Sequence, residues 1–108
     1  MYFYDPEDRE KKQTNDGVYA RTFWGEKLMF SLVDLQAHTI IPSHLHPHEQ
    51  ATFVVKGVVE VAIGDETRWV KQGELFIVPG NTAHSLRADA EPVQILGAFT
   101  PVRKDLKY

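Results

Sequence analysis

The chain contains no cysteine, so it can form neither a disulfide nor a thiolate metal site. It also lacks any apolar run long enough to span a membrane. The net charge is −3, with 12 Lys and Arg against 15 Asp and Glu, and the basic residues form no cluster. These absences exclude a disulfide-rich scaffold and give no electrostatic basis for binding nucleic acid or an anionic membrane.

The first residues of the chain lack the basic and apolar segments of a signal peptide. Together with the absence of cysteine, this leads us to expect a cytoplasmic protein. The chain has 108 residues, 43% of them hydrophobic and 25% charged, which is typical of one globular domain. Because residues 5–16 are charged and aperiodic, we expect a loose N-terminal arm over residues 1–16 and a single barrel domain over residues 17–108.

The hydrophobic residues alternate with period two far more often than with the period of a helix. This pattern predicts strands over residues 28–35, 58–63, 67–70, 75–78 and 93–99. The expected strands are short and are separated by glycine or proline, and no segment has a helical pattern. The sequence therefore predicts an all-β sandwich or barrel.

Histidines gather in one short segment that looks like the end of a β-strand. His44 and His46 are two residues apart, so in a strand their rings would share one face. Imidazole is the commonest neutral ligand for first-row divalent metals, and two rings on one strand supply half of a site. Taken alone, the pair is equally compatible with a polar strand end.

A second segment resolves this ambiguity, because together the two segments resemble the paired signature of the cupin superfamily. In the first motif, His-x-His is followed after three residues by Gln50 and after six more by Gly57. The second motif, Gly-x5-Pro-x-Gly-x-x-His, is matched by Gly73, Pro79 and His84, with Asn81 in place of the middle glycine. Asparagine tolerates a positive φ better than most residues do, so this replacement is mild.

The resemblance implies the cupin fold, a double-stranded β-helix that forms a jelly-roll-like antiparallel barrel. It also implies one divalent transition metal (Fe, Mn, Ni, Co or Zn), with the ligands His44, His46, Gln50 and His84. Four neutral ligands would leave the ion's charge uncompensated, which favours Lewis-acid chemistry. The set also lacks the two-His-one-carboxylate pattern that often marks oxygen-activating iron.

Other side chains near the first motif are weaker ligand candidates. Glu49 comes one residue early for the cupin spacing, and strand alternation turns it away from the face of Gln50. We interpret His48 as capping the bend at Pro47 or meeting solvent, and His38 as a surface residue in a turn.

The C-terminal segment resembles the tail of small cupins related to the KdgF pectin-degradation proteins, which read Asp-x-Phe-x-Pro-x-Arg. Phe99 and Arg103 match this pattern, whereas Gly97 stands in place of the aspartate. The resemblance implies that Phe99 and Arg103 belong to a catalytic site that converts cyclic unsaturated uronates to linear keto sugars. An arginine can bind a carboxylate bidentately, which fits a role in binding an acidic substrate. The sequence is equally compatible with Arg103 being a solvated residue near the terminus.

Three functions therefore stand as hypotheses. The first is a metal-dependent lyase or isomerase acting on a small oxygenated substrate such as a sugar acid. The alternatives are a quercetinase-like dioxygenase and a non-enzymatic cupin that binds a metal or a sugar acid. We also expect a homodimer, because Phe53 and Val55 should face outward from the barrel, where a second subunit could cover them.

Overall fold

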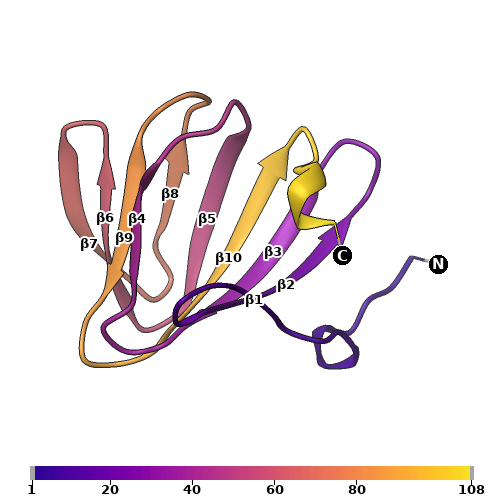
Figure 1. Cartoon of the computed structure of the whole chain (residues 1–108), viewed down its shortest axis with the longest axis horizontal. Coiled ribbons are helices and arrows are strands. Elements are labelled where there is room, and N and C mark those ends of the chain that lie inside the picture. The colour runs from indigo at the N-terminus through magenta and orange to yellow at the C-terminus, as the bar shows by residue number, and fades with distance from the viewer. Residues whose placement is uncertain (1, 108) are drawn as a thin grey trace.

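Residues 2–107 are described by a computed structural model in which two antiparallel β-sheets pack against each other (Figure 1). Sheet A has the strand order β1-β2-β3-β10-β5-β8, and sheet B has the order β4-β9-β6-β7. The strands of sheet A are β1 (Lys12–Asn15), β2 (Val18–Trp24), β3 (Met29–Leu35), β10 (Val93–Thr100), β5 (Glu49–Lys56) and β8 (Leu75–Val78). Those of sheet B are β4 (Ile40–His44), β9 (His84–Ala88), β6 (Val58–Ile63) and β7 (Glu66–Lys71).

Two short 3-10 turns complete the regular structure, η1 (Pro6–Asp8) and η2 (Lys104–Leu106). Within the described residues, no helix has the length and apolar character needed to cross a membrane. The expected all-β antiparallel architecture is confirmed, and so are the five predicted strands, which correspond to β3, β6, β7, β8 and β10.

The core lies between the two sheets and follows from strand alternation. Along β5, the side chains of Gln50, Thr52 and Val54 are buried, while Ala51 and Phe53 between them are exposed. The apolar cluster that joins the sheets comprises Val18, Leu35, Val54, Val59, Val61, Val70, Phe76, Val78, Leu86, Ala88, Val93 and Ile95. Because Gln50 and Thr52 share the inward face of β5 with Val54, polar groups extend from this core toward one end of the barrel.

The N-terminal segment is more ordered than the expected loose arm. Strand β1 pairs antiparallel with β2, with Lys12 opposite Ala20 and Gln13 opposite Tyr19. All four residues of β1 are exposed, so the strand has no apolar alternation that could have revealed it. Its pairing depends on backbone hydrogen bonds to β2, which a side-chain pattern does not report.

Strand β2 also escaped sequence analysis, because polar residues interrupt its apolar pattern. Arg21 is 5% exposed, and its Nη1 donates to the carbonyl oxygen of Pro6 at 3.0 Å. Its Nη2 lies 3.7 Å from Oδ2 of Asp34 on β3. The buried guanidinium of Arg21 thus connects the N-terminal segment, through Pro6, to Asp34 on sheet A.

Candidate metal centre and pocket

Two loops meet at one end of the barrel, residues 45–48 between β4 and β5 and residues 79–83 between β8 and β9. A Cβ atom on Gly80 would lie 2.5 Å from the carbonyl oxygen of Pro47, so only glycine permits this approach. The backbone N–H of Asn81 donates to the carbonyl oxygen of His46 at 2.7 Å. Asn81 has a φ of 61°, which is the left-handed conformation that its place in the second motif requires.

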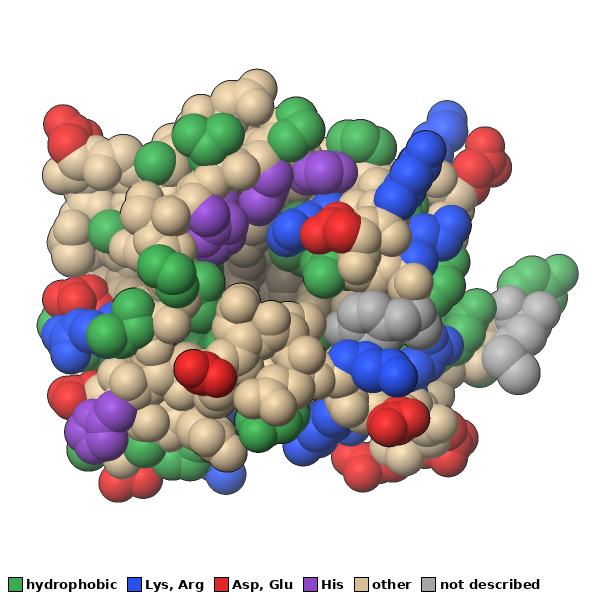
Figure 2. Space-filling view, viewed as in Figure 1, with side chains coloured by type: hydrophobic (Ala, Val, Ile, Leu, Met, Phe, Trp, Pro, Cys, Tyr) green, Lys and Arg blue, Asp and Glu red, His purple; other side chains and the backbone are tan. Residues whose placement is uncertain are grey.

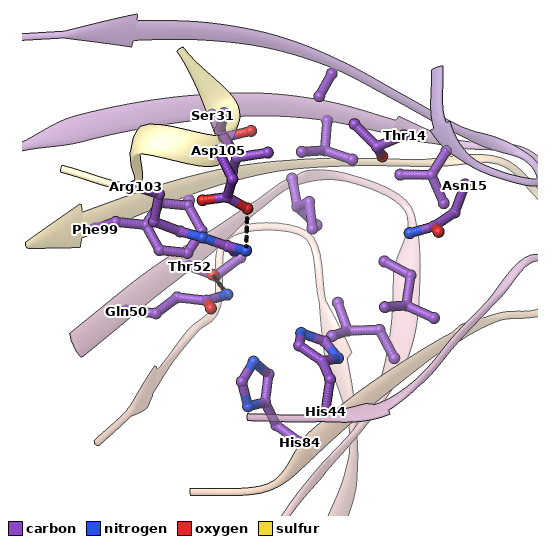
Figure 3. Close-up of a pocket in the computed structure, with 18 of the residues that line it drawn as sticks. Thr14, Asn15, Ser31, His44, Gln50, Thr52, His84, Phe99, Arg103 and Asp105 are labelled. Carbon is purple, nitrogen blue, oxygen red and sulfur yellow. Dashed lines mark hydrogen bonds and ion pairs between the residues drawn. The ribbon is translucent and has the colours of Figure 1, made fainter. Parts of the chain in front are cut away.

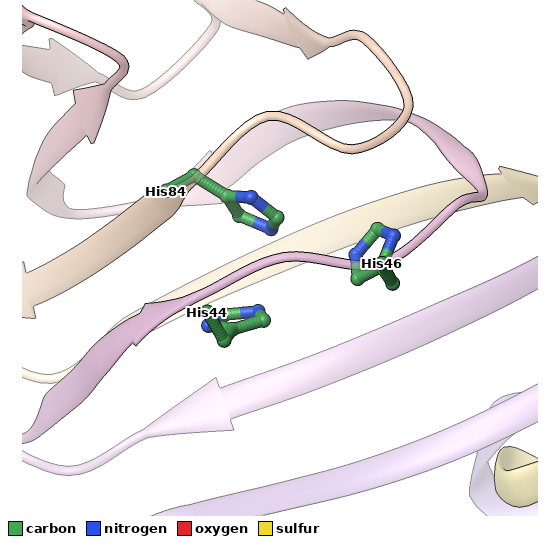
Figure 4. A group of neighbouring side chains, drawn as sticks. All are labelled: His44, His46 and His84. Carbon is green, nitrogen blue, oxygen red and sulfur yellow. The ribbon is translucent and has the colours of Figure 1, made fainter.

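The histidines of the two motifs converge at this end of the barrel (Figure 4). His44 ends β4 and lies directly opposite His84, the first residue of β9. The sequence led us to expect His44 and His46 on one face of a single strand. Instead β4 ends at His44, and His46 lies in the loop that follows. One nitrogen from each of the three rings lies within 4.8 Å of the others, a spacing that can hold a metal ion.

Each imidazole is fixed by a backbone carbonyl on its Nδ1 side. The distances from Nδ1 to the carbonyl oxygens are 2.8 Å for His44 to Pro42, 3.0 Å for His46 to His48 and 2.8 Å for His84 to Thr82. A carbonyl oxygen can only accept, so Nδ1 carries the proton and, in a neutral ring, Nε2 is left with a lone pair. Carbonyl partners of this kind orient metal-binding histidines.

Gln50 aims a further lone pair at the same place. Its side-chain nitrogen donates to Oγ1 of Thr52 at 3.0 Å, which turns Oε1 toward the histidines. That oxygen lies 3.2 Å from Nε2 of His46, so two acceptors face each other when His46 is neutral. A cation between them would satisfy both atoms.

Burial favours the neutral form of two of the rings. Desolvation is the largest cause that lowers the pKa of His84 below the ordinary 6.5, with the nearby His44, His46 and Arg103 acting in the same direction. Desolvation also lowers the pKa of His46, assisted by the charge of Arg103. In addition, Nε2 of His84 is buried and has no hydrogen-bond partner among the described residues. The donor set therefore fits a divalent ion with nitrogen and oxygen ligands.

The remaining candidates near the first motif lie apart from this group. Glu49 is exposed on the opposite face of β5. The ring of His48 is half-buried, with its centroid 5.5 Å from that of His46, but it is not one of the three converging histidines. Its contribution is the backbone carbonyl that accepts from His46. His38 is exposed in a turn, as expected.

His44 and His84 open onto a cavity of about 550 Å³, which is large enough for a small organic molecule (Figure 3). Figure 2 shows the hollow on the surface, bordered by histidine side chains. Its polar lining comprises Thr14, Asn15, Ser31, His44, Gln50, Thr52, His84, Arg103 and Asp105. Its apolar lining is formed by Val18, Ala20, Val33, Ile41, Pro42, Leu86, Ile95, Phe99 and Leu106.

The tail residues Phe99 and Arg103 both line this cavity, so Arg103 is not a free surface residue. The Phe99 ring is buried, and the guanidinium carbon of Arg103 lies 5.1 Å from the ring centroid. A Cβ atom at Gly97 would come within 3.3 Å of the Phe99 ring. Asp105 also enters the cavity, and the sequence patterns did not identify this residue.

Comparison with protein families matches residues 31–99 to the cupin domain, a span that includes both motifs. The chain belongs to the cupin family. The pectin degradation protein KdgF of Dickeya dadantii is 29% identical to this cupin over 106 residues, which cover 96% of each chain. An uncharacterised protein of Streptomyces coelicolor is 29% identical over 91 residues, or 84% of this cupin and 87% of that protein.

Among solved structures, KdgF from Halomonas sp. superposes with a TM-score of 0.93, covering 99% of each chain at 24% identity. This likeness extends over strands β1 and β2 as well as the two motifs, so it establishes the fold of nearly the whole cupin.

We predict that His84→Ala sharply lowers the metal content, because it removes a buried ligand, whereas Glu49→Ala leaves the content nearly intact. Elemental analysis of protein prepared without a histidine tag provides the measurement. If Glu49→Ala strips the metal while Gln50→Ala does not, the ligand assignment on β5 is wrong.

We also predict that the metal-free cupin loses stability as the pH falls below about 6.5. The pKa values of His46 and His84 are lowered in the folded state, so the unfolded chain takes up protons first and is favoured by acid. Urea unfolding at pH 7.5 and pH 5.5 should show a smaller loss for His84→Asn than for the wild type. The exposed His38→Asn serves as the control, and an equal effect of both substitutions would contradict the prediction.

Proposed function

We propose that this cupin is a divalent-metal-dependent enzyme acting on a small oxygenated acid, with KdgF-like conversion of cyclic unsaturated uronates to linear keto sugars as the leading assignment. The observation that supports it most directly is the convergence of three histidine nitrogens, with Gln50 Oε1 lying 3.2 Å from Nε2 of His46, beside a cavity that also contains Arg103. The relationship to the pectin degradation protein over nearly the whole chain points to the same substrate class.

In this proposal, the residues that would hold the ion are His44, His46, Gln50 and His84. A bound ion would provide Lewis-acid chemistry toward an oxygen atom of the substrate. The ligand atoms are pre-oriented, since backbone carbonyls hold the three imidazoles and Thr52 holds the Gln50 amide. This arrangement favours metal binding without reorganisation of the side chains.

The other residues of the cavity position the substrate. Arg103 binds the substrate carboxylate, and its guanidinium is kept over the Phe99 ring. The apolar walls exclude water around the reacting carbon atoms, which strengthens the electrostatic interactions of the polar end. In this proposal, Arg103 binds the carboxylate at one end of the substrate, and the metal site would bind an oxygen at the other end.

A second candidate is a non-enzymatic cupin that binds a sugar acid, and Gly97 is the observation that favours it. The position carries no side chain, and a Cβ atom placed there would lie 3.3 Å from the Phe99 ring, which is closer than ordinary van der Waals contact. The aspartate of the resembling tail therefore has no counterpart at this position. Binding without turnover would identify the cupin as a binding module.

We further propose that the outer face of sheet A forms a homodimer interface. Phe30, Phe53, Leu75 and Ile77 are between 41% and 61% exposed. The strand register places Leu75 opposite Phe53, and Phe53 opposite Leu96 on β10. Such a continuous apolar band is characteristic of surfaces that a second protein covers.

For the enzymatic activity, we predict that the metal-loaded cupin consumes an unsaturated uronate, followed by loss of the conjugated alkene absorbance. His84→Ala should abolish this activity. Arg103→Ala should raise KM about tenfold or more, because a charge-assisted hydrogen bond is lost. If the wild type binds the uronate without consuming it, the binding-module candidate replaces the enzyme.

For the dimer, we predict a sedimentation mass of twice 12.3 kDa at tens of micromolar protein. Phe53→Glu should convert it to a monomer, because the substitution places a charge in the centre of the apolar band. Glu60→Gln, which alters a polar residue on sheet B, is the control. A wild-type mass of one chain would refute the dimer.

A further inference from the structure

The C-terminal segment forms one wall of the cavity. After Thr100 it leaves β10, and its residues Arg103, Asp105 and Leu106 line the cavity. The segment is anchored by Oγ1 of Thr22, whose fully buried side chain donates to the carbonyl oxygen of Leu106 at 2.6 Å. This bond on η2 holds the neighbouring Asp105 at the mouth of the pocket.

Asp105 carries the only carboxylate among the described residues that line this cavity. Its Oδ2 lies 3.1 Å from Nη2 of Arg103 (Figure 3). The Arg103 side chain is 20% exposed, whereas that of Asp105 is 61% exposed. The pair therefore joins a cation inside the pocket to an anion that solvent can reach.

Asp105 contacts only one of the two N–H donors, Nε and Nη2, that an arginine can present together to a carboxylate. Nε and Nη2 point their N–H bonds in parallel and can bind both oxygens of one carboxylate. Asp105 is bonded to Nη2, but Nε of Arg103 is buried and has no hydrogen-bond partner among the described residues. Asp105 therefore leaves the Nε donor of Arg103 unsatisfied.

We propose that Asp105 is a built-in placeholder for a ligand carboxylate on Arg103, and that acidic ligands bind by exchanging with it. The inference rests on the proposed function only in taking an acid as the ligand. An exposed ion pair is weak, whereas a ligand carboxylate can bond to Nε and Nη2 together, so exchange is favourable. Asp105 thereby selects against anions that cannot bind both nitrogens.

The test is calorimetric titration of the metal-loaded cupin with D-galacturonate, a saturated uronate, and with its uncharged methyl ester. Asp105→Asn should tighten the binding of galacturonate about threefold to fivefold, because the competing charge is removed. The affinity for the ester should not change. Asp89→Asn changes the net charge equally at an exposed position outside the cavity, and it should have no effect.

A double substitution separates competition from a general electrostatic effect. In an Arg103→Gln background, Asp105→Asn should no longer alter the affinity for galacturonate, since the group for which both carboxylates compete is gone. In the wild type, the NMR signal of the Arg103 Nε–H group should shift on addition of galacturonate and remain unmoved by the ester.

Weaker or unchanged galacturonate binding by Asp105→Asn would overturn the proposal and would assign Asp105 to positioning Arg103. Failure of both wild type and variant to bind galacturonate would also overturn it. Tighter binding by Asp105→Asn, together with no consumption of unsaturated uronate by the wild type, would support the placeholder and reject the enzymatic function.

Discussion

The backbone contact between Gly80 and Pro47 determines where His46 lies at the candidate metal site. His46 lies beyond the end of β4, so no sheet register fixes its ring. Its position instead depends on the loop of residues 79–83, which approaches closely because Gly80 has no side chain. His44 and His84, in contrast, are cross-strand neighbours. The candidate site thus combines a pair of histidines held by a sheet with a third histidine whose position depends on packed loops.

Strand alternation and motif spacing made much of this structure predictable. They identified five strands and the histidines that the structure brings together, and the tolerance of asparagine for a positive φ agrees with the φ of 61° at Asn81. They could not show β1, whose side chains are all exposed, or β2, where the buried Arg21 interrupts the apolar pattern. Burial of that arginine depends on tertiary partners on β3 and the N-terminal segment.

The fine structure of the site was also beyond sequence reasoning. The carbonyl groups that orient the imidazoles belong to Pro42, His48 and Thr82, and any residue type could supply them. Likewise, an aspartate two residues after Arg103 matches no motif, and only the turn at η2 brings it into the cavity. Backbone groups and local turns contribute as much to this pocket as the recognisable side chains do.

The location of the proposed ligands has a mechanical consequence for a chain without cysteine. His44 and His84 belong to sheet B, while Gln50 belongs to sheet A. An ion shared by these residues would join the two sheets, and it would also close the long stretch of chain between residues 44 and 84. It would therefore act as a reversible cross-link, stabilising the closed sandwich over the unfolded chain in the way that a disulfide does elsewhere.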